Sequence, residues 1–223
     1  MARSFRKEIK APDSFQLTVQ KTLAWYRANE KTILVAAGAL VIAIGSYVGY
    51  WAWNTSLHER AALGLAIAES LPSEPAVQQA ALKALRKVSV DFPGTKAGIL
   101  AKLRLGALLI EGGEHKAAER EYRGGIKTGG LGEMESELAR RGLAGSLSLQ
   151  GKCTEALPIW GEILTAGSLL AQEDLYISQS ACLAELGKKG AALKSLETLI
   201  EKHPGSPFIT PELRARMDHL RNG

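Results

Sequence analysis

The residues most able to support chemistry are four histidines and two cysteines in a chain of 223 residues. The histidines are scattered along it, at His58, His115, His203 and His219. No two of them have the i, i+4 spacing that places metal ligands on one helix face. The chain also lacks the Gly-x-Ser-x-Gly nucleophile motif and the phosphate-binding loop that ends in Gly-Lys-Ser or Gly-Lys-Thr. We therefore expect no catalytic residues, no cofactor and no metal site.

The two cysteines, Cys153 and Cys182, are too few for a disulfide-rich scaffold or a four-thiolate metal site. They lie at nearly equal distances on either side of residue 168, where we expect a loop between two antiparallel helices. The cysteines can thus face each other, and an oxidising compartment would allow a disulfide. This bond would close a loop of about 30 residues and stabilise the fold by roughly 3–4 kcal/mol on the chain-entropy estimate. Two buried, unpaired thiols are the alternative.

An apolar segment near the N-terminus determines which cellular compartment contains the two cysteines. Residues 32–58 carry no formal charge, and Ser46 is the only plainly polar side chain between residues 33 and 53. A helix of that length matches the bilayer core of about 30 Å, and aromatic residues flank both of its ends. We predict a transmembrane signal anchor at residues 32–53. A buried core helix and a cleaved signal peptide are the alternatives, but the bulky aromatic end lacks a small-x-small cleavage pattern.

Basic residues predict the orientation of this anchor. Residues 1–31 contain seven lysines and arginines, whereas residues 54–82 contain one. The positive-inside rule then places residues 1–31 in the cytoplasm and residues 54–223 on the opposite side of the membrane. Most of the net charge of +5 lies in this leader, beside anionic lipid, so the charge does not indicate a nucleic-acid partner.

Patterns on both sides of residue 32 predict further helix contacts. In the leader, an apolar stripe from Phe15 to Tyr26 has helical spacing, which predicts an interfacial amphipathic helix capped by Asp13. A partly ordered tether is the alternative. In the anchor, small residues at Gly38, Gly45 and Gly49 share one face, which lets another membrane helix approach closely. This face permits helix pairing in the membrane, and an oligomer through the anchor is one possible result.

Residues 70–205 contain a repeat of about 37 residues. Its marker is a small alanine, found at Ala81, Ala118, Ala156 and Ala192. Leu-Gly or Leu-Ala pairs and turn glycines accompany the clear copies, and Pro93 and Pro204 close two of them. These residues resemble the tetratricopeptide repeat, although Lys102 and Gln179-Ser180 depart from its pattern. The resemblance implies an all-α fold in which helix pairs stack into a solenoid.

Both ends of this array can be predicted. The apolar spacing of residues 54–71 predicts that the anchor helix continues as the first helix of the array. Thr210 and Pro211 predict the start of a C-terminal capping helix, because threonine is a favourable N-cap and proline fits the first helical position.

The first clear copy also has a second apolar face, which predicts a partner site. The set, with the matching positions of the next two copies, is Leu100, Leu103, Ala107, Ile110, Leu138, Arg141 and Ile177. Helical solenoids present such a face on their concave side. Coverage of this face by a neighbouring helix is the alternative. Tetratricopeptide domains that grip a carboxylate need Lys and Asn where this chain has Leu103 and Ala107, so that clamp is absent.

The complete layout resembles a bacterial family of membrane-anchored tetratricopeptide proteins, the ancillary subunits of the Sec translocon. The resemblance implies an anchor in the bacterial inner membrane and a scaffold on its periplasmic side, which assists newly translocated proteins. The translocon and unfolded clients would be its partners. A scaffold for cell-envelope assembly or cell division is the alternative.

Overall fold

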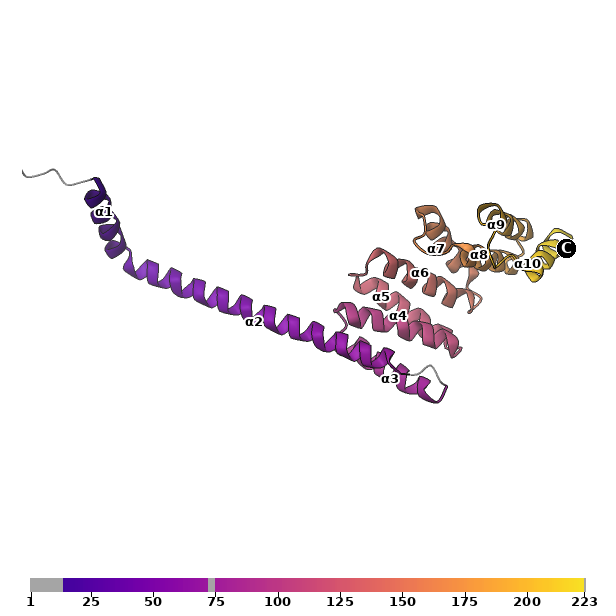
Figure 1. Ribbon diagram of the computed structural model, residues 1–223, viewed down its shortest axis with the longest axis horizontal. Coiled ribbons are helices and arrows are strands. Elements are labelled where there is room, and N and C mark those ends of the chain that lie inside the picture. Colours follow the sequence, from indigo (N-terminus) through magenta and orange to yellow (C-terminus); the bar gives the residue numbers. More distant parts are fainter. Residues whose placement is uncertain (1–13, 72–74, 223) are drawn as a thin grey trace, which may run out of the picture. The chain divides into compact units, whose positions relative to one another are not determined.

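The computed structural model describes residues 14–71 and 75–222, and the regular structure of this part is entirely α-helical, as predicted (Figure 1). Its helices are α1 (Ser14–Ala28), α2 (Glu30–Glu69), α3 (Pro75–Asp91), α4 (Lys96–Glu111), α5 (His115–Thr128), α6 (Glu133–Ser148), α7 (Cys153–Ala166), α8 (Glu173–Glu185), α9 (Lys189–Lys202) and α10 (Pro211–Asn222). The chain divides into two compact units, Met1–Thr55 and Ser56–Gly223, and α2 runs through the division without a break.

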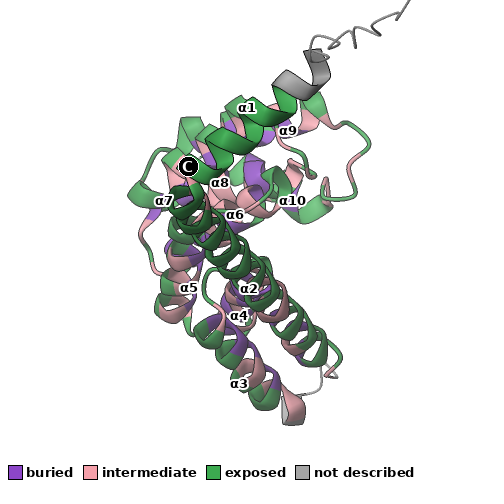
Figure 2. Cartoon of the chain, turned by 90° about the vertical axis from the view of Figure 1, so that its left-hand side faces the viewer, coloured by how far each residue is buried: buried purple, intermediate pink, exposed green. Residues whose placement is uncertain are grey.

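The first unit contains α1 and the N-terminal part of α2. Within the described residues, α2 is the helix long and apolar enough to cross a membrane, and its most apolar stretch has no buried residue. Figure 2 accordingly shows most of α2 in the colour of exposed residues. A core helix of a globular domain would bury this stretch against other helices. The predicted cap Asp13 and the side chain of Phe15 lie outside the described residues.

The second unit is a stack of antiparallel helices. From α3 to α10 each helix contacts the next one along the chain, and α4 also contacts α6, as α6 contacts α8 (Figure 1). The repeat alanines Ala118, Ala156 and Ala192 are completely buried at these crossings. Small side chains let the helix backbones approach, so the spacing of the alanines in the sequence determines where the helices cross.

The turns within the three clear repeats have one geometry. Gly113, Gly151 and Gly187 all adopt positive φ angles, between 72° and 76°. After each glycine a backbone N–H donates to the carbonyl five residues earlier, as from Glu114 to Leu109 at 2.8 Å and from Lys188 to Leu183 at 2.8 Å. This bond satisfies carbonyls at the end of the helix, and glycine adopts the left-handed conformation at low steric cost. The predicted glycine turns are therefore confirmed.

The last helix of the array is α10. Helix α10 begins at Pro211, and the hydroxyl of Thr210 accepts a hydrogen bond of 3.3 Å from the Leu213 N–H. Leu213, Met217 and Leu220 are buried against α8 and α9. A larger core cluster extends from the Ser56–Glu69 part of α2 to α8. The C-terminal cluster is thus a satellite of the main core.

Candidate functional site: the α4 groove

Helix α4 lines two adjoining cavities of the second unit. The first, of about 300 Å³, is lined by Glu69, Leu100, Leu103, Arg104, Ala107, Tyr122 and Leu138. The second, of about 460 Å³, shares Glu69, Arg104 and Ala107 with the first and extends between the end of α2, α3 and α4. We call the two together the α4 groove.

The groove exists because α4 is apolar on more than one side. Leu105 and Leu109 are completely buried between the helices of the array. Leu100 and Ala107 lie on another side of the helix and are only half-buried. On α6, Leu138 completes the wall and leaves 47% of its surface exposed. An apolar hollow that remains open in this way can take up the apolar side chains of another polypeptide.

The sequence pattern predicts Leu103 on an exposed face, but the structure buries its side chain. Its side chain is 8% exposed and belongs to the main core. It packs against α5 so closely that a Cβ atom on Gly125 would lie 3.1 Å from Leu103 Cδ2. Leu103 therefore forms the floor of the groove, where the repeat core needs it.

The structure brings together part of the predicted partner site. Leu100, Leu103, Ala107 and Leu138 line one cavity. Ile110 packs against the main core and Ile177 against the C-terminal cluster, and neither lines the groove. That the first four bind a partner stays a prediction.

The sequence pattern predicts Arg141 on the same face as a charged anchor, but the structure engages it in contacts within the fold. Its Nε donates to Glu137 at 2.8 Å, its Nη1 to Asp174 at 2.9 Å, and its Nη2 to the Ala171 carbonyl at 2.7 Å and to Ser168. The side chains of Arg141 and Glu137 are 13% and 4% exposed. Because every guanidinium nitrogen has a partner, Arg141 holds the α7–α8 loop and the start of α8 against α6.

Glu137 is the buried centre of this network. It accepts hydrogen bonds from the Ser168 hydroxyl and from the Leu169 N–H at 2.8 Å. Burial raises the pKa of the Glu137 carboxyl, but these bonds and Arg141 outweigh burial and hold the pKa below its usual range. The carboxylate thus remains charged and fixes the loop.

Sequence reasoning missed three residues of the smaller cavity, namely Glu69, Arg104 and Tyr122. Glu69 Oε1 and Arg104 Nε form an ion pair of 3.2 Å, with side chains 45% and 68% exposed. Burial, and then the charge of Glu111, raise the pKa of Tyr122 to about 12. The sequence could have predicted Arg104 as a lining residue, because it follows Leu100 by one helical turn. The sequence could not have predicted Glu69, since its position depends on where α2 ends.

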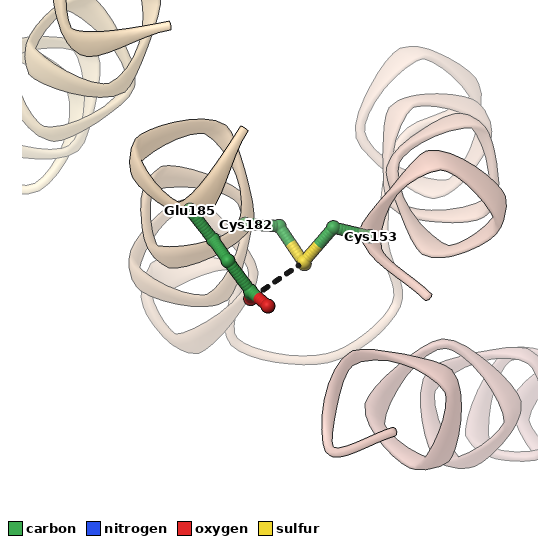
Figure 3. A group of neighbouring side chains, drawn as sticks. All are labelled: Cys153, Cys182 and Glu185. Carbon is green, nitrogen blue, oxygen red and sulfur yellow. Dashed lines mark hydrogen bonds between the residues drawn. A yellow bond between two sulfur atoms is a disulfide. The ribbon is translucent and has the colours of Figure 1, made fainter. Parts of the chain in front are cut away.

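Cys153 and Cys182 form a disulfide between α7 and α8, with Cα atoms 5.1 Å apart (Figure 3). The bond links the second clear repeat to the third. Figure 3 shows the carboxylate of Glu185 beside the sulfurs, with Oε2 3.2 Å from Cys153 Sγ. The three side chains are close enough together to hold a metal ion. Sulfurs joined in a disulfide are not thiolates, however, so in this state the group is a covalent crosslink.

Comparison with known proteins agrees with the geometry of the array. The family model of the tetratricopeptide repeat-like domain matches residues 23–174. A search of curated proteins gives no match. The matched range contains α2 to α7 and stops at the start of α8, although the turn at Gly187 repeats the geometry of the two before it. Because the match covers more than half of the chain, this protein belongs to the tetratricopeptide repeat-like domain family.

Proposed function

We propose that this protein is a membrane-anchored scaffold whose α4 groove binds segments of other polypeptides. The observation that carries the proposal is the groove itself, with a half-buried leucine of α4 and an exposed leucine of α6 beside an ion pair. Tetratricopeptide arrays act through protein–protein contacts, and apolar side chains of a partner would be buried in such a hollow. No enzymatic chemistry is needed for this role.

Two features support a periplasmic position for the array. The seven basic residues before the anchor favour a cytoplasmic N-terminus. The disulfide between Cys153 and Cys182 suits an oxidising compartment such as the bacterial periplasm. A reporter active only outside the cytoplasm should therefore be active when fused after Gly223 and inactive when fused before Met1. The reverse result would contradict the proposed compartment.

Within that compartment we assign the protein to the translocon, as an ancillary subunit that assists newly translocated proteins. An array tethered to the inner membrane is close to chains that emerge unfolded, and such chains expose the apolar segments that the groove would bind. A Cβ atom placed on Gly38, Gly45 or Gly49 would have no other atom within 4 Å, which leaves that face open to a second membrane helix, of the same protein or of the translocon.

Purification of the full chain from its own membranes in mild detergent tests this assignment. We expect translocon subunits and unfolded periplasmic clients to copurify. The variant Leu138→Asp should lose the clients, because it places a charge on the wall of the groove. Leu149→Asp is the matched control, since Leu149 is also exposed but lies outside the groove. Copurification of envelope-assembly or cell-division proteins in place of the translocon would overturn the assignment.

A further inference from the structure

Two helices end at the larger cavity of the α4 groove, and both end in an acid. Helix α2 ends at Glu69 and α4 ends at Glu111, and both side chains line the cavity. Neither helix has a basic residue in its last turn. The C-terminus of a helix carries a partial negative charge, which basic residues usually offset. Here the carboxylates add to that charge, so the cavity lies in a negative potential.

Among the described residues, the groove has one cation, and it is already paired. Arg104 forms the ion pair with Glu69 at 3.2 Å. Glu111 is exposed and has no ion pair within the described part of the chain. The charged residues that line the groove are thus two carboxylates and one guanidinium, with a net charge of −1. An incoming anion would meet this net negative charge.

We infer that the α4 groove binds partner segments that carry a lysine or arginine about one helical turn from their apolar side chains. The apolar side chains would occupy the hollow lined by Leu100, Ala107 and Leu138. The cation would pair with Glu111 at the ends of α2 and α4, where it also offsets the negative charge of the two helix ends. This inference rests on the proposed function and specifies the chemistry of the partner at the same site.

Three labelled peptides test the inference against the full chain in mild detergent, with fluorescence anisotropy as the measurement. Each is a peptide of about 20 residues, long enough to form a helix, with two leucines one turn apart. The three differ in a Lys, Gln or Glu one turn further on. We expect the Lys peptide to bind about threefold to fivefold more tightly than the Gln peptide, as is usual for one exposed charge pair. The Glu peptide should bind most weakly, and added salt should reduce the differences.

Two variants of the chain make the test specific. Glu111→Gln should abolish the preference for Lys over Gln, and the variant should fold because the side chain is exposed at a helix end. Glu162→Gln is the matched control, since this exposed carboxylate of α7 lies outside the groove, and it should keep the preference.

The outcomes separate this inference from the proposed function. Equal affinities for the three peptides, all weakened by Leu138→Asp, would overturn the cation preference and retain the groove as a docking site. Tightest binding of the Glu peptide would also overturn it, in favour of an anion site at Arg104. Absence of binding, or binding unaffected by Leu138→Asp, would overturn the proposed function as well.

Discussion

Gly106 of α4 faces the ring of Tyr122 of α5 so closely that a Cβ atom on the glycine would lie 2.8 Å from two ring carbons. Gly142 of α6 lies against two of the same ring atoms, Cζ and Cε2, and a Cβ atom there would clash as well. The tyrosine thus fills the space between two successive repeats. The glycine of the Leu-Gly pair is required by this side chain, whatever its cost to the helix.

We predict that Gly106→Ala destabilises the protein by about 1–3 kcal/mol, the usual cost of overpacking a core. The result is diagnostic because alanine is the better helix former by about 1 kcal/mol. Gly145→Ala is the control, since a Cβ atom at this position would have nothing within 4 Å, and it should be neutral or stabilising. Thermal unfolding of the full chain in detergent measures both. A gain in stability for Gly106→Ala would contradict the close packing.

Removal of the guanidinium of Arg141 should be among the most damaging changes. In Arg141→Met the buried Glu137 carboxylate would lose its cation, which typically costs about 3–5 kcal/mol. The exposed pair of Arg104 and Glu69 provides the comparison, and Arg104→Met should cost less than about 1 kcal/mol. Denaturant unfolding of both variants gives the two values. Similar small losses would mean that Arg141 is dispensable to the fold and free to serve as a partner anchor.

The Glu119 carboxylate should make the free energy of unfolding depend on pH in the acidic range. Its carboxylate accepts hydrogen bonds from Lys152 at 2.8 Å, from Gln150 and from Arg123, and these lower its pKa from 4.5 to about 2. A group with a lowered folded-state pKa contributes stability above its unfolded value, and this contribution is lost as pH falls through the folded value. We expect the folded state to lose about 1–3 kcal/mol of its free energy of unfolding between pH 4.5 and about 2.

The variant Glu119→Gln isolates this contribution. Unfolding free energies of the two proteins should differ at pH 7 and converge near pH 2. A difference that stays constant over this range would assign the effect to packing, and not to the charge of Glu119.

Substitution by glutamate should have different effects at two leucines of the groove, Leu103 and Leu138. Leu103→Glu buries an unpaired carboxylate in the core and should destabilise by several kcal/mol, about the cost of an uncompensated buried charge. Leu138→Glu, at an exposed position, should change stability by less than about 0.5 kcal/mol while it weakens partner binding. Melting temperature and peptide binding are measured on both variants. Unchanged melting of Leu103→Glu would show that the floor of the groove is open.

The disulfide should be detectable by chemical mapping and by its effect on stability. Mass mapping without reductant, on protein from its own compartment, should find Cys153 joined to Cys182. Replacement of both by alanine should cost about 3–4 kcal/mol on the chain-entropy estimate, and reduction of the wild type should have a similar effect. Two thiols that alkylate freely without denaturant would contradict the bond.

The repeats were predictable because their signals are local. Ala118 must be small where helices cross, and Gly113 must adopt a positive φ, so both requirements are visible in spacing alone. The groove was only partly predictable. Helix α4 is apolar on several sides, and its sequence does not distinguish Leu103 in the floor from Leu100 in the wall. The partners of Arg141 also depend on tertiary structure, because Ser168 lies in a distant loop and Asp174 in the next repeat.

The crosslink between α7 and α8 has a mechanical consequence. A solenoid is a chain of weakly coupled units, and under tension or thermal stress such a chain opens one unit at a time, usually from an end. The bond from Cys153 to Cys182 spans the junction between two units, so α8 cannot separate from α7 while the bond is intact. The groove lies elsewhere in the array, beside α3 and α4, where the chain has no such crosslink. A bound segment that pulled on the groove would therefore load a part of the solenoid that can yield and re-form without breaking a covalent bond.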